Sequence, residues 1–247
     1  LDTSSVSLSL TMKQNPSRTQ LTPSDNISSL SNYTENTWYN GWVYTKANSS
    51  STGKSKITTV CTDVRSNGNT YENFASYRNI GTNGTATITC NAQNEAGTKA
   101  TEVKKVIKID MTVPELDIVT KLKTNETNLT NTSNYSSLAN YTNNTWTNGY
   151  VLVVPVVKAN VSSATVTCID DRFAAGSSDR TFSLYRNVNT EGTTTIECYA
   201  TNAAGTKSAS VAKIIKLDRI KVNIKQIKIK YLNLALYKAE HICYKLL

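Results

Sequence analysis

The cysteines are the residues of this chain whose spacing points most clearly to chemistry. Cys61 and Cys90 recur, at nearly the same separation, as Cys168 and Cys198. Neither pair has C-x-x-C spacing or a nearby histidine, so a zinc site is not expected. Both pairs fall on segments that a β-sandwich could place side by side. This favours two intradomain disulfides and an oxidising compartment, with four buried thiols as the alternative.

The remaining candidates for chemistry are one histidine and a few carboxylates. His241 is the only histidine, so a repeated Ser-His-Asp or Cys-His arrangement is not possible. Asp63, Asp170 and Asp171 could suggest calcium ligands, but calcium loops carry several acids at alternate positions. We interpret these three as solvated or turn-capping residues. We therefore expect a non-enzymatic protein with no catalytic residue, no metal site and no cofactor.

The segments that carry the cysteines occur twice. The phrase NYTENTWYNGWV begins at Asn32 and NYTNNTWTNGYV begins at Asn140, an offset of 140 − 32 = 108 residues. The strings YRN and AGTK recur at the same offset. A unit of about 100 residues suits an independent β-sandwich domain rather than a solenoid repeat of roughly 20–50 residues.

The repeat also predicts the domain boundaries. Asp110 and Asp218 end the two copies, and Asp2 occupies the matching position before the first. We expect a longer parent protein with further modules. The predicted parts are residues 1–3 as the end of a preceding repeat, 4–112 as repeat 1, 113–218 as repeat 2, and 219–247 as a basic C-terminal tail. The tail is interpreted as a truncated or degenerate next repeat, with a basic membrane-surface segment as the alternative.

The composition favours strands. Asn, Ser and Thr make up 88 of the 247 residues, and these side chains compete with helix by bonding the local backbone. Ile196, Cys198 and Ala200 alternate with polar neighbours, as on a half-buried strand. We predict an all-β fold of two tandem immunoglobulin-like β-sandwich domains with a short irregular C-terminal tail. The polar segment 124–142 is either an extra edge hairpin or a mobile loop.

Charge and hydropathy exclude two classes of function. The net charge is +9, but seven Lys or Arg residues and a single acid lie from Arg219 onward. The body is therefore close to neutral and lacks the basic face of a nucleic-acid-binding domain. No run approaches the roughly 20 apolar residues that span a bilayer, so we expect no integral membrane segment.

Three strings, NTWTNGYV, ATNAAGTK and KIIKLD, occur in this order and resemble bacterial Ig-like repeats. Asp110, Thr112 and Pro114 match the D-x-T-x-P entry of that family, and the W-T-N-G motif is matched from Trp146. The third motif of the family, A-x-x-x-A-G-N, is approximated by Ala200, Ala204, Gly205 and Thr206, with Thr206 in place of Asn. The resemblance implies tandem sandwich modules of surface-anchored or secreted bacterial proteins that serve adhesion, display or spacing.

The chain departs from antibody-type domains, in which a Trp lies between the two cysteines. Trp38 and Trp146 precede both cysteines of their copies. We therefore expect each disulfide to join neighbouring strands of one sheet.

Aromatic residues are the better candidates for binding. Tyr39, Trp42 and Tyr44 surround Trp38 and could contact a ligand, because aromatic faces bind sugars and protein partners. The alternative is that each Trp plugs its sandwich. We expect an extracellular or cell-surface adhesin stalk or spacer whose partner is a protein or glycan on another cell surface. Alternatives are a carbohydrate-binding accessory module of a secreted glycoside-active enzyme and a glycosylated eukaryotic receptor fragment.

Overall fold

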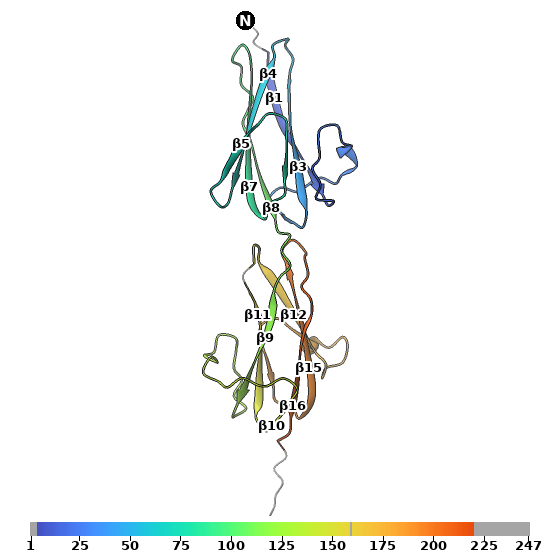
Figure 1. The fold of residues 1–247 in the computed structure, drawn as a ribbon, viewed down its shortest axis with the longest axis vertical. Helices are drawn as coiled ribbons and strands as arrows, with labels where there is room; N and C mark the ends of the chain where they lie inside the picture. The colour runs from blue at the N-terminus through green and yellow to red at the C-terminus, as the bar shows by residue number, and fades with distance from the viewer. Residues whose placement is uncertain (1–3, 159, 220–247) are drawn as a thin grey trace, which may run out of the picture.

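The computed structural model describes residues 4–158 and 160–219, apart from the side chains of 71 and 72. Figure 1 shows two β-sandwiches following one another along the long axis of the molecule. Apart from two short 3₁₀ segments, Ile27–Ser29 and Ser178–Arg180, the regular structure of the described residues is entirely strand. Residues 1–3 and, except for Arg219, the predicted tail 219–247 lie outside the described residues.

The first module is built from two sheets. Its strands are β1 (Val6–Asn15), β2 (Trp38–Tyr39), β3 (Trp42–Ser51), β4 (Ile57–Arg65), β5 (Thr70–Phe74), β6 (Tyr77–Ile80), β7 (Gly84–Asn94) and β8 (Val103–Ile109). One sheet has the order β1-β3-β6 and the other β2-β8-β7-β4-β5. All these pairings are antiparallel except that of β2 with β8.

The second module repeats this plan. Its strands are β9 (Leu116–Lys123), β10 (Trp146–Thr147), β11 (Tyr150–Val157), β12 (Ala164–Asp170), β13 (Thr181–Phe182), β14 (Arg186–Val188), β15 (Gly192–Asn202) and β16 (Val211–Leu217). The sheets have the orders β14-β11-β9 and β10-β16-β15-β12-β13. The prediction of two tandem immunoglobulin-like sandwiches is confirmed.

Each core is closed by a disulfide within the five-stranded sheet. Cys61 on β4 bonds Cys90 on β7, its direct register partner. Cys168 on β12 and Cys198 on β15 are paired in the same way. All four cysteines are fully buried. The prediction of neighbouring strands is confirmed, and the alternative of free thiols is wrong.

A tyrosine, and not the tryptophan, plugs the end of each sandwich. Tyr141 is 5% exposed, whereas the nearby Trp146 is 60% exposed. The hydroxyl of Tyr141 donates to the carbonyl of Thr145 at 2.5 Å and accepts from the backbone N–H of Lys216 at 2.9 Å. Tyr33 is equally buried in the first module. The interpretation of Trp146 as the plug is wrong, because Tyr141 fills that place.

The aspartates on β4 and β12 are buried ion-pair partners. Asp63 and Asp170 have no exposed area. In the second module, Arg172 Nε donates to Asp170 Oδ1 at 2.9 Å, and Arg186 Nε lies 3.5 Å from Asp170 Oδ2. The expectation of solvated or turn-capping residues is therefore wrong for Asp63 and is met by Asp170 only as a turn cap, since Asp170 Oδ1 accepts from the Arg172 backbone N–H at 3.2 Å. It fits Asp171, whose Oδ1 accepts from the backbone N–H of Thr195 at 2.8 Å.

The long polar segment of each module is a loop fixed to the outer side of the three-stranded sheet. In the second module, Asn187 Nδ2 donates to the carbonyl of Leu129 at 2.8 Å, and Leu129 N–H donates to Asn187 Oδ1 at 3.2 Å. Asn79 makes the same pair of bonds with Leu21. Segment 124–142 is thus a loop held by the Asn of the YRN motif. It contributes only the isolated bridge of Asn140 with Lys121 to the sheet ladders.

Candidate functional site

The connector between the modules, residues 110–115 between β8 and β9, is a polar site outside the two cores. Side chains from both modules form hydrogen bonds with it. Asp110 follows β8, and its backbone N–H donates to the carbonyl of Tyr39 at 3.1 Å. Its side chain has no exposed area. The carboxylate faces Ser162, which lies in the β11–β12 loop of the second module.

The carboxylate of Asp110 joins the two modules. Its Oδ2 accepts from the Ser162 hydroxyl at 2.5 Å and from the Ser162 backbone N–H at 3.0 Å. Its Oδ1 accepts from the backbone N–H of Thr112 at 2.9 Å. Hydrogen bonds to a charged acceptor are roughly twice as strong as neutral ones. Asp110 is therefore a charged latch between the end of β8 and the second module.

Two asparagines hold the connector from opposite sides. Asn83, in the β6–β7 loop of the first module, accepts from Met111 N–H at 2.9 Å and donates to Thr112 Oγ1 at 3.0 Å. Asn202, at the end of β15 in the second module, donates to the Thr112 carbonyl at 2.9 Å. The connector is thus bonded to both modules through side chains.

Electrostatics favour the charged form of the latch. Burial raises the pKa of the Asp110 carboxyl, but the hydrogen bonds from Ser162 and Thr112 outweigh this effect and hold the pKa below the ordinary value of 3.8. Asp110 is therefore charged at neutral pH, and both of its carboxylate oxygens accept hydrogen bonds from protein groups. The arrangement can fix two modules in one orientation, and it offers no catalytic chemistry.

The three aromatic residues expected to contact a ligand do not form one exposed cluster. Tyr44 has no exposed area. It alternates on β3 with the core residue Val43, so it points outward, yet the ring of Tyr77 stacks on it at a centroid separation of 5.9 Å, and its register partner Asn79 binds the polar loop at Leu21. The prediction for Tyr44 as a ligand contact is therefore wrong.

Tyr39 and Trp42 are each half-buried against their own module. Tyr39 packs on the first core and meets Tyr33 edge to face at a ring-centroid separation of 6.4 Å. The ring of Trp42 lies against Gly81, where an added Cβ would come within 2.4 Å of it. Their role in binding stays a prediction.

Among the described residues, no group of three or more His, Cys, Asp or Glu side chains could hold a metal ion. No helix in the same part of the chain is long and apolar enough to cross a membrane.

Sequence reasoning identified Asp110 and Thr112 but missed Ser162 and Asn202. A signal for both was present, because Asn202 repeats Asn94 at the 108-residue offset and Ser162 repeats Ser55 at the same distance before the first cysteine of its module.

No family model matches the chain, and no curated protein matches it. A solved structure of fibronectin(III)-like modules of Clostridium thermocellum CbhA is similar to it, with 13% sequence identity and a TM-score of 0.26. The match covers 75% of this chain and 90% of that one. At this identity and TM-score, we take nothing about function from the likeness.

Proposed function

We propose that this chain is a non-enzymatic spacer segment of a surface or secreted protein. In this role, disulfide-closed sandwiches are set end to end and carry or present a binding activity at a distance. The observation that supports this most directly is the connector, which Asn83 holds from one module while Ser162 and Asn202 hold it from the other.

A spacer must resist bending at its joints, and the connector has the features that this requires. A free hinge residue retains backbone entropy worth about 1–2 kcal/mol, which a connector bonded on both sides gives up. Pro114 fixes one further φ angle and is itself buried. Relative motion of the modules would break charge-assisted bonds to Asp110 in a buried site, where no water replaces them.

The two disulfides support an extracellular or cell-surface location for this spacer. Such bonds persist in oxidising compartments and are rare in the cytosol. Each closes a loop of 29 or 30 residues, for which the chain-entropy model gives a stabilisation of about 3–4 kcal/mol. Modules closed in this way would stay folded when exposed outside the cell.

Backbone ¹⁵N relaxation of the intact chain tests the proposal, because it reports whether two modules tumble together. We expect one common correlation time and one common diffusion tensor for both sandwiches. A variant with a Gly-Ser-Gly-Ser insertion after Thr112 is the control, since a flexible linker of this composition uncouples domains. Independent tumbling of the wild-type modules, as in the insertion variant, would contradict the spacer proposal.

A carbohydrate-binding accessory module is a second candidate, and a Trp–Lys pair that recurs in both modules, exposed in the second and half-buried in the first, favours it. Trp146 is 60% exposed and Lys216 Nζ lies 5.8 Å from its ring centroid. Trp38 and Lys108 repeat this arrangement at 5.7 Å. A glycan array probed with wild type and with a Trp38→Ala, Trp146→Ala double variant would distinguish the candidates. Glycan binding that depends on these rings supports the second, and its absence in wild type excludes it.

A further inference from the structure

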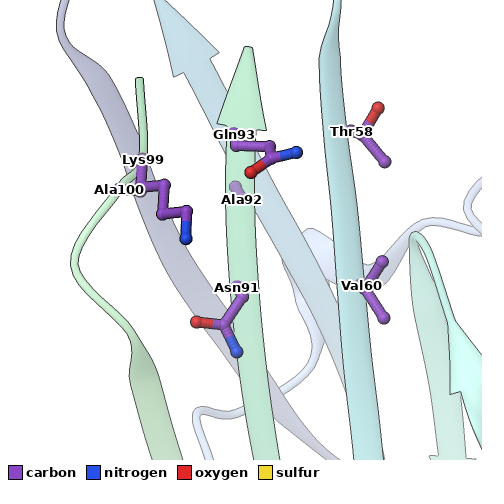
Figure 2. A pocket seen from close by; sticks show the side chains of 7 residues that line it. All are labelled: Thr58, Val60, Asn91, Ala92, Gln93, Lys99 and Ala100. Atoms are coloured by element: carbon purple, nitrogen blue, oxygen red, sulfur yellow. The ribbon is translucent and has the colours of Figure 1, made fainter. Parts of the chain in front are cut away.

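The outer face of the five-stranded sheet of the first module carries an open hollow of about 260 Å³. Figure 2 shows its lining side chains on β4, on β7 and on the segment after β7. They are Thr58, Val60, Asn91, Ala92, Gln93, Lys99 and Ala100. Lys99 and Val60 stand on opposite sides of β7 in this view, and Gln93 extends from β7 toward Thr58. Val60 is 41% exposed.

The second module has the same local backbone but differs at four of the corresponding side chains: it has Thr167, Tyr199, Thr201 and Ser208 where the first module has Val60, Asn91, Gln93 and Ala100. Lys99 forms an isolated antiparallel β-bridge with Gln93 across the turn that follows β7. Lys207 forms the same kind of bridge with Thr201 after β15. The residue at the centre is Asn91 in the first module and Tyr199 at the matching position of the second. Lys207 Nζ lies 3.4 Å from the centroid of the Tyr199 ring. The second module therefore places its own aromatic ring where the first module has its hollow.

We propose that the hollow of the first module binds the side chain of a tyrosine from a protein partner, in the place that the Tyr199 ring takes in the second module. The volume lies below the roughly 300–1,000 Å³ of pockets for drug-sized ligands, so one ring is a fitting occupant. Lys99 supplies the cation for the face of that ring, as Lys207 does for Tyr199.

The lining explains why a tyrosine suits the hollow better than a purely apolar ring. Val60 and Ala100 offer an apolar surface for the ring. Thr58 and Gln93 add a hydroxyl and an amide that can bond a phenolic hydroxyl at the rim. Asn91 Nδ2 donates to Glu102 Oε2 at 3.3 Å, which bonds its amide to the residue just before β8. This site is independent of the spacer role and would give the segment a recognition surface of its own.

The test uses the intact chain and N-acetyl-tyrosinamide as the probe, with binding followed by ¹⁵N chemical shifts. Millimolar concentrations are needed because a single ring contact gives weak affinity. We expect saturable shifts at Thr58, Val60, Gln93 and Lys99, and none with N-acetyl-leucinamide. Lys99→Ala should weaken binding roughly two- to fivefold, the size of an exposed cation–π contact.

One substitution makes the result decisive. Asn91→Tyr places the ring of the second module at the centre of the hollow and should abolish the shifts. Thermal unfolding of each variant confirms that it is folded, and common tumbling of the modules should be unchanged. Absence of saturable shifts at the hollow in the wild type, or shifts that persist in Asn91→Tyr, would overturn the proposal.

Discussion

Replacing Asp110 with asparagine tests the charged latch with a minimal change of shape. The wild-type Oδ2 accepts two hydrogen bonds from Ser162, at 2.5 and 3.0 Å, in a site with no exposed area. A hydrogen bond to a charged group contributes about 1.5–3 kcal/mol when it is buried. Because the two bonds share one acceptor and are not additive, we expect a total loss of about 2–4 kcal/mol for Asp110→Asn.

Urea unfolding of the intact chain measures this loss, and hydrogen exchange locates it. Ser162 N–H lies in the second module and the bonded carboxylate follows the last strand of the first. Exchange should therefore accelerate in the β11–β12 loop and at the start of β9, while the centres of β7 and β15 change little. Asp117→Asn is the matched control, because Asp117 is exposed on β9 and belongs to no inter-module bond that the structure records.

The pH dependence of the free energy of unfolding is a second test of the Asp110 carboxylate. The pKa of Asp110 is lowered in the folded state, so its contribution to stability is fully present above the ordinary carboxyl value and is lost as pH falls through the folded pKa. In Asp110→Asn, the free energy of unfolding should decline less steeply in this acid range. A loss below about 0.5 kcal/mol, together with an unchanged acid slope, would refute the idea of a charged latch.

Three further substitutions test the remaining polar features. Asp170→Asn should destabilise the second module by about 3–5 kcal/mol in urea unfolding, because it removes the fully buried carboxylate that pairs with the half-buried Arg172 and Arg186; an effect no larger than that of Asp171→Asn would contradict this. Burial lowers the pKa of Lys123. The free energy of unfolding should therefore rise as pH increases from the folded pKa of Lys123 toward the ordinary lysine value. Lys123→Asn should remove this rise, which thermal unfolding at a series of pH values measures. Asn187→Ala should speed hydrogen exchange around Leu129, and unchanged protection there would show that the loop is held by other contacts.

Much of the fold could be predicted because the information is local and occurs twice. Alternation of Ile196, Cys198 and Ala200 places these residues in the core, and all three are fully buried. The recurring cysteine pairs gave the disulfides, since a sandwich has few places where two strands bring recurrent cysteines together. A second copy in the same chain served as an independent observation of each pattern.

The wrong predictions concern the exposure of aromatic side chains, which depends on contacts with residues far away in the sequence. Tyr44 follows a simple alternation and points outward, but it is fully buried, and Tyr77 of β6 stacks on its ring. A Trp at the same place in both copies favoured a plug at Trp146, whereas Tyr141 takes that place. A tyrosine can bond the backbone groups at the end of the sandwich through its hydroxyl, and composition alone does not reveal this choice.

The two copies also offer a matched test of the connector within one molecule. Asn94 and Asn202 occupy equivalent positions, and each Oδ1 accepts from a turn N–H at 2.8 Å, that of Thr98 or of Thr206. Among the described residues, Asn94 Nδ2 is buried and has no hydrogen-bond partner, whereas Asn202 Nδ2 donates to the Thr112 carbonyl.

Substitution by alanine removes the turn bond in both modules but the connector bond only in the second. Asn202→Ala should therefore cost about 0.5–1.5 kcal/mol more than Asn94→Ala, the net contribution of one neutral hydrogen bond. Hydrogen exchange read separately on β7 and β15 assigns each loss to its module. Equal losses would mean that the bond from Asn202 to the connector adds nothing to stability, and the stiffness of the joint would then depend on Asp110 and Asn83 alone.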